Sequence, residues 1–315
     1  MIRFKSFPNA ENHNPNWLPL LRIGVAITLI AKIIAEFKYA YLIYGSQGIV
    51  QGVINEKIFT PYTLTLHHVS SIFSGFIAES NFITVFFIIY LILAIFLLLG
   101  YKTRVVAFAC WLFHVCLFNN SPLVSYGVDS FLMSLLFYCF IFPTQLTYSI
   151  DCLLKRYNYD NKTLRYYQLF LQLHLCIVYG VAGLAKLRGA TWLDGEAVWY
   201  AINQPQFYSY FTASLIDFAA KNPIIIYLLT WGTLFAEIGY SFFIWMKKVR
   251  VFFFISIILM HLFIGIVMNL QLFALAMIAF NIAAFGTVVY ADVKEMVRMP
   301  RRRVMKKIVP IAVEG

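Results

Sequence analysis

The chain has 315 residues, of which 61% are hydrophobic and only 12% are charged, and its formal net charge is +11 at pH 7. A soluble domain of this length could not bury so much apolar surface, because single hydrophobic cores stop growing at about 250–300 residues. Several apolar runs approach the length of about 20 residues that crosses a bilayer. The composition therefore excludes a soluble globular protein and predicts an all-α, polytopic membrane protein.

The N-terminal segment 1–16 is too polar for a cleavable signal peptide, so we expect the first apolar run to remain in the protein as a span. Hydropathy predicts eight transmembrane helices at about 17–36, 82–100, 104–119, 128–149, 165–187, 223–246, 250–268 and 270–290. The long connections 37–81 and 188–222 alternate apolar with polar residues, which favours interfacial or re-entrant helices that roof a cavity. We expect one transmembrane domain, 17–290, followed by a basic tail, 291–315.

Basic residues alternate between the connections. Eighteen of the 25 Lys and Arg lie in the N-terminal segment, at 101–104, 150–165 and 247–250, and in the tail. The alternate connections hold five, and Arg22 and Lys32 lie inside the first span. The positive-inside rule then places both termini in the cytoplasm, with the more polar connections on the extracytoplasmic face. We interpret the basic tail as an anchor on anionic membrane lipids rather than as a nucleic-acid-binding segment.

The fifth predicted span carries polar residues at seven-residue spacing: Gln172, Tyr179 and Lys186. An ideal helix drifts by only about 20° per heptad, so these residues lie on one stripe that reaches the outer surface. Gly180 and Gly183 lie near it and would admit another helix or a flat ligand. Spacing alone leaves two alternatives for Lys186: a lysine that snorkels to the membrane surface, or a base.

Other polar residues in the spans need partners in hydrocarbon. Glu237 and Arg22 are predicted to form a buried structural ion pair. His114 and His261 are expected to be hydrogen-bonded packing residues, since no metal-ligand spacing accompanies them and we expect no metal. Asp129 could favour its own helix dipole or partner a cation such as Lys186.

Three stretches show a resemblance to a family. IVYGVAGLAKLRGATWLDGEA around Lys186, MNLQLF (268–273) and NNSPLVSYGVDSFL (119–132) resemble the membrane domain of vitamin K-dependent γ-glutamyl carboxylase and the related HTTM (horizontally transferred transmembrane) family. The Lys186 stretch is the most specific of the three. The resemblance covers most of the chain as a membrane domain.

The resemblance implies an enzyme in which the lysine deprotonates a reduced naphthoquinone (vitamin K hydroquinone or menaquinol). Oxygen then converts the quinone to an epoxide, and the strong base formed removes a proton from a peptide glutamate, which captures carbon dioxide. Lys186 would be this base, because desolvation at a membrane edge favours a neutral amine. Asp129 and Tyr126 are candidates for the proton relay. The candidate cofactor-binding residues are Asn120, Tyr179, Gly183, Trp192, Asn269 and Gln271, and we expect a quinol-sized cavity that opens outward near Lys186.

The chain departs from the carboxylase pattern at Asn119-Asn120-Ser121, where the enzyme has Asn-Asn-His, and it shows no counterpart of the large lumenal domain. Short family members also resemble sporulation-delaying protein B. The alternative is therefore a non-enzymatic membrane factor for maturation or export of a secreted toxin-like peptide. Either function implies a small secreted peptide or protein as partner, and an accessory protein could take part. A transporter is a distant third, because the spans show no paired broken helices.

Overall fold

The computed structural model describes residues 15–49, 63–120 and 124–308, with side chains as far as 298. These residues form helices and connecting turns, and no strand occurs among them. Most of the predicted N-terminal segment 1–16, the end of the tail 291–315, and Ser121 lie outside the described residues. The expected all-α fold is confirmed.

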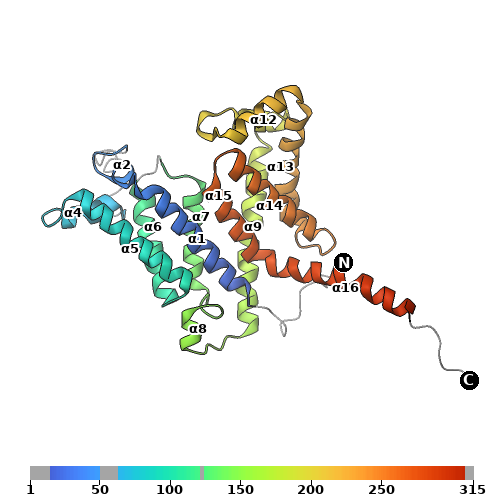
Figure 1. Cartoon of the computed structure of the whole chain (residues 1–315), viewed down its shortest axis with the longest axis horizontal. Coiled ribbons are helices and arrows are strands. Elements are labelled where there is room, and N and C mark those ends of the chain that lie inside the picture. The colour runs from blue at the N-terminus through green and yellow to red at the C-terminus, as the bar shows by residue number, and fades with distance from the viewer. Residues whose placement is uncertain (1–14, 50–62, 121–123, 309–315) are drawn as a thin grey trace, which may run out of the picture.

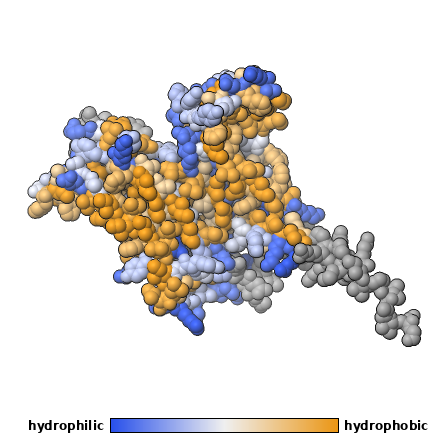
Figure 2. Space-filling view, in the orientation of Figure 1, coloured by the Kyte–Doolittle hydropathy of each residue, from blue (hydrophilic) through white to orange (hydrophobic). Residues whose placement is uncertain are grey.

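Six helical segments of the described chain are long and apolar enough to cross a membrane. They are α1 (Trp17–Phe37), α5 (Glu79–Leu99), α9 (Asn161–Lys186), α13 (Ile224–Phe243), α14 (Arg250–Val267) and the run Gln271–Arg298. That last run joins α15 (Gln271–Asn281), the π-helical segment η3 (Ile282–Gly286) and the start of α16 (Thr287–Ile308). The protein is therefore a multi-pass membrane protein. Figure 2 shows the matching apolar band between two more polar ends.

The other two predicted spans are helices of 18 and 15 residues, α6 (Thr103–Asn120) and α7 (Gly127–Ile141). They are not among the six segments above, so the count of eight spans stays a prediction. The predicted range 128–149 was too long, because α7 ends before Pro143. Phe142 has an extended backbone (φ −78°, ψ 149°), as the residue preceding a proline usually does. A short helix, α8 (Ile150–Leu154), follows it.

The helices form two groups that meet at α15. In one group α1 packs against α5 and α7, and α6 packs against α5 and α7; in the other α13 packs against α9 and α14. α15 contacts α1, α7 and α14 (Figure 1). Short helices do form in the two long connections. Those after the first span are α2 (Ala40–Tyr44) and α4 (Leu66–Phe73), and those after α9 are α10 (Ala190–Leu193), α11 (Ala197–Ile202), η2 (Pro205–Phe207) and α12 (Tyr210–Lys221).

The predicted ion pair between Arg22 and Glu237 is wrong. The fully buried Arg22 instead donates from Nη1 to the carbonyl oxygens of Leu97 (3.0 Å) and Leu98 (2.9 Å), and from Nη2 to the carbonyl of Tyr148. The first two acceptors are among the last carbonyls of α5, which have no partner within their own helix. A cation is favourable at this helix end, and so Arg22 ties α1 to the end of α5.

Gly100 caps α5 in the left-handed conformation (φ 71°), where a glycine carries no steric penalty. A Cβ atom at this position would also collide with the Arg22 guanidinium. The helix end and the buried arginine therefore both require a residue without a side chain here.

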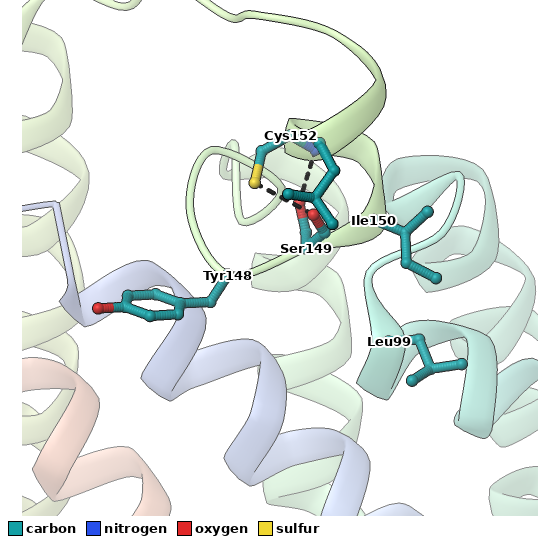
Figure 3. A pocket seen from close by; sticks show the side chains of 6 residues that line it. Leu99, Tyr148, Ser149, Ile150 and Cys152 are labelled. Carbon is teal, nitrogen blue, oxygen red and sulfur yellow. Dashed lines mark hydrogen bonds between the residues drawn. The ribbon is translucent and has the colours of Figure 1, made fainter.

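An open hollow of about 460 Å³ lies at the same end of the bundle as Arg22. Figure 3 shows the residues that line it: Leu99, Tyr148, Ser149, Ile150, Cys152 and Leu153. This end carries α8, whereas α9 reaches Lys186 at the opposite end, beneath α10 to α12 (Figure 1). The hollow is therefore not the cavity expected near Lys186, and that cavity stays a prediction.

Candidate functional site

Close contact between α9 and α13 places a carboxylate beside Lys186. A Cβ atom added at Gly183 would lie 2.5 Å from Ile238 Cγ1, and one at Gly180 would lie 3.2 Å from Ser241 Oγ. The two glycines therefore admit a helix rather than a flat ligand, as small residues do between membrane helices. Glu237 precedes Ile238 on α13, and this approach brings it to the end of α9.

Lys186 and Glu237 form an ion pair. Lys186 Nζ lies 2.7 Å from Glu237 Oε1 and 2.5 Å from Oε2. The lysine side chain is 24% exposed and the glutamate side chain only 7%, so a molecule that arrives from outside the bundle meets the amine first. Lys186 Nζ also lies over the Trp192 ring, 5.3 Å from its centroid. The site therefore combines a reachable amine, a buried carboxylate and an aromatic face.

The amine of Lys186 points into the bundle, and helix geometry explains why. Every Cα–Cβ bond of an α-helix tilts toward the N-terminus, and long side chains follow that direction. Lys186 is the last residue of α9, so its side chain runs back along the helix toward Glu237. A lysine that snorkels to the membrane surface would extend the other way. Of the two alternatives left open by spacing, the structure therefore does not show the snorkelling form.

The polar stripe of α9 continues inward from Lys186. Tyr179 is buried, its hydroxyl accepts a hydrogen bond from Asn281 Nδ2 (2.6 Å), and its ring lies 5.9 Å from that of His261. Gln172 Nε2 donates to the carbonyl of Ala284 (2.8 Å). The expected stripe of Gln172, Tyr179 and Lys186 thus lies on a face that packs against other helices.

A second charged cluster lies in the other group of helices, around Lys32 of α1. Lys32 Nζ lies 2.8 Å from Asp129 Oδ1 on α7 and also bonds Glu36 on its own helix. Tyr44 of α2 donates to Glu36 Oε2 (2.9 Å). The Lys32 and Asp129 side chains are 4% and 5% exposed, so this cluster is enclosed. Asp129 therefore partners a lysine, but that lysine is Lys32 and not Lys186.

Backbone and side-chain bonds hold this Lys32 cluster in place. Asp129 Oδ2 accepts from the backbone N–H of Tyr126 (3.0 Å), as an N-terminal carboxylate does for its own helix. His114 Nε2 is 3.0 Å from the Asp129 carbonyl, and its Nδ1 is 3.1 Å from the Tyr90 hydroxyl.

The second histidine of the spans, His261 on α14, lies outside this cluster, and its Nδ1 bonds the Ile257 carbonyl (2.9 Å). Both histidines are hydrogen-bonded and buried, as predicted. Tyr126, at the start of α7, has a pKa that partial burial raises above its usual value.

The candidate residues that the sequence grouped around Lys186 have different partners in the structure. Trp192 lies beside it, whereas Asn120 accepts from the His67 N–H and donates to the Tyr44 carbonyl, both at 2.9 Å. Asn269 and Gln271 bond each other (2.9 Å) and are exposed. Among the described residues, no group of three or more His, Cys, Asp and Glu side chains is placed to hold a metal ion.

Sequence reasoning missed two groups of functional interest. One is the Lys186–Glu237 pair, and the other is the cluster that Lys32 and Glu36 form with Asp129. The second had a visible signal. Lys32 and Glu36 stand four residues apart in an otherwise apolar helix, the spacing at which opposite charges meet on one face.

A match to a protein-family model shows which family the chain belongs to. The model of the HTTM domain matches residues 11–289, which is nearly the whole of it. No curated protein and no solved structure gave a significant match. The family match spans both lysine sites and most of the described membrane segments, and the chain therefore belongs to the HTTM family.

Proposed function

We propose that this protein is an integral membrane enzyme that resembles vitamin K-dependent carboxylase. It would use a reduced naphthoquinone, oxygen and carbon dioxide to modify a secreted peptide at the extracytoplasmic face. The observation that supports this proposal is the Lys186–Glu237 pair beside Trp192, in which a partly exposed amine meets a buried carboxylate. An ionisable pair inside a membrane bundle is a functional-site candidate by default.

The side chains present suit a flat, weakly acidic ligand. Lys186 and Glu237 can exchange a proton with a phenolic hydroxyl, and Trp192 offers an aromatic face next to the amine. When bound, a reduced naphthoquinone would supply the electrons that oxygen accepts. Gly183 and Tyr179 do not contribute to this surface, because Ile238 fills the space beside Gly183 and Tyr179 is buried below it.

Within this proposal, Glu237 acts as the proton relay in place of Asp129 and Tyr126, the candidates from the sequence. Lys186 must lose a proton before it can act as a base, and Glu237 is the group in contact with its Nζ. Exclusion of water when a ligand covers the site disfavours both charged forms. The proton can then pass from the ammonium to the carboxylate, which leaves a neutral amine facing the ligand.

A lysine-to-arginine substitution tests this role. Lys186→Arg keeps the positive charge, but a guanidinium remains protonated near neutral pH and cannot act as a base. The purified variant in lipid nanodiscs should fold and show no turnover of vitamin K hydroquinone to its epoxide. The matched control is Lys221→Arg at the end of α12, which should retain full activity. Full activity of Lys186→Arg would remove Lys186 from the chemistry.

The alternative is a non-enzymatic factor for maturation or export of a secreted toxin-like peptide, and the same ion pair is compatible with it. A lysine already bonded to Glu237 can serve packing alone. Mass spectrometry of peptides encoded by neighbouring genes, with and without this protein, separates the two functions. A mass gain equal to a carboxyl group supports the enzyme, whereas altered cleavage or secretion without that gain supports the factor.

The proposed active face rests on the predicted orientation, which labelling can test. Gln204 lies after α11 on the Lys186 side, Asn161 begins α9 at the other end, and both are exposed. A cysteine at 204 should react with an impermeant thiol reagent added outside intact cells, and a cysteine at 161 should not. The reverse pattern would put the site on the cytoplasmic face.

A further inference from the structure

Polar side chains gather directly beneath the Lys186–Glu237 pair. Tyr240 lies three residues beyond Glu237 on α13, close to one turn of helix, and its ring centroid is 4.8 Å from that of Tyr179 on α9. Asn281, the last residue of α15, bonds the Tyr179 hydroxyl. Tyr179, Tyr240 and Asn281 are each at most 2% exposed. The proton transfer proposed above does not use any of them.

The hydrogen bonds of Asn281 fix its orientation. Its Nδ2 donates to the Met277 carbonyl (2.8 Å) and to the Tyr179 hydroxyl (2.6 Å). A carbonyl can only accept, so the amide nitrogen must face Met277 and the amide oxygen must face the other way. The Tyr179 oxygen uses a lone pair to accept this bond and keeps its own hydrogen for donation.

Two polar atoms at this place have no partner among the described residues. They are the Tyr240 hydroxyl and Asn281 Oδ1, and both belong to fully buried side chains. A buried polar group without a hydrogen bond is costly, and most such groups in folded proteins bond protein or ordered water. Together with Tyr179 they offer two O–H donors and one carbonyl acceptor, the set that a single water molecule can satisfy.

The adjoining backbone carries a buried carbonyl whose hydrogen-bond partners are in place. The π-helical segment η3 begins directly after Asn281, and π-turns often occur at functional sites. The Ala284 carbonyl within it accepts from Gln172 Nε2 (2.8 Å) and Gln168 Nε2 (3.2 Å). Two glutamines of α9 therefore serve this carbonyl, while Tyr240 and Asn281 are left to a different partner.

We propose that Tyr240, Asn281 and Tyr179 bind a water molecule inside the bundle, close to one turn of α13 below Glu237. The water accepts from the two phenols and donates to Asn281 Oδ1, which gives it three bonds. The binding of this water does not depend on the proposed function of Lys186 and Glu237, so the two proposals can fail separately.

Removing one phenol oxygen tests the binding. If Tyr240 bonds a water, Tyr240→Phe leaves Asn281 and that water short of a partner and should lower the melting temperature in detergent by about 2–4 °C. The control is Tyr90→Phe, which removes an equally buried phenol with a protein partner, His114, and should cause a similar loss. An unchanged or raised melting temperature for Tyr240→Phe, with a loss for Tyr90→Phe, overturns the proposal.

Radiolytic labelling gives a direct readout. Brief X-ray exposure of the full-length protein in nanodiscs generates hydroxyl radicals from bound water, so Tyr240 or Tyr179 should be oxidised despite burial, and Tyr90 should not. Absence of label at both positions overturns the water site, whatever the enzyme does. An inactive wild-type protein that still shows this label would overturn the proposed function and leave the water site standing.

Discussion

The two lysine clusters of this bundle differ in what surrounds the amine. Lys32 is enclosed and shared between two carboxylates, Glu36 and Asp129. Lys186 is partly exposed, has one carboxylate partner, and lies over a tryptophan. A ligand can reach the second amine without unpacking helices, but not the first. A charged residue inside a membrane is therefore not a reactive group by that fact alone, because accessibility separates a structural lysine from a candidate base.

Charge balance sharpens this contrast. The Lys186–Glu237 pair is formally neutral, whereas Lys32 faces two carboxylates and its cluster carries an excess negative charge when all three groups are ionised. The Asp129 side chain is 5% exposed and the Glu36 side chain 17%, and Lys32 is the counter-charge bonded to both. The cluster also joins α1, α2 and α7, so it holds these three helices together.

The largest expected effect follows from removing Lys32. Lys32→Met keeps the length and apolar character of the side chain but leaves Glu36 and Asp129 without a counter-charge. The free energy of unfolding should fall by about 3–5 kcal/mol, measured by denaturant titration in detergent. The double variant Lys32→Met/Asp129→Asn should recover part of that loss. If Lys32→Met were as stable as the wild type, the enclosed cluster would have no structural role.

The sequence allowed much of the fold to be predicted but little of the pairing. Apolar runs located the helices, because length and hydropathy are local properties of the chain. The prediction of an Arg22–Glu237 pair failed because the depth of a residue in the membrane does not tell which face of its helix the side chain occupies. Arg22 faces the end of α5, where the last carbonyls of the helix accept its hydrogen bonds, and Glu237 faces α9 because Gly183 admits Ile238. Both outcomes depend on the packing of segments that are far apart in sequence.

A smaller and asymmetric effect is expected at the second pair. Lys186→Met leaves the buried Glu237 carboxylate unpaired and should cost about 2–3 kcal/mol of unfolding free energy. Glu237→Gln leaves Lys186, which is partly exposed and can turn toward water, so its cost should be about 1 kcal/mol. The same detergent titration measures both variants. Equal losses would mean that the two partners are equally enclosed, and would erase the contrast with Lys32.

The smallest effect should come from the aromatic ring that only the second cluster has. Trp192→Leu keeps an apolar side chain but removes the π face beneath Lys186 Nζ, and a cation–π contact at a partly exposed site contributes about 0.5–1 kcal/mol. A double-mutant cycle with Lys186→Met isolates this contact, because the coupling energy between two residues disappears once either is removed. Trp199→Leu on α11 is the matched control and should show no coupling to Lys186. Zero coupling for Trp192 would mean that the ring and the amine are neighbours without attraction, and Trp192 would lose its place beside the proposed base.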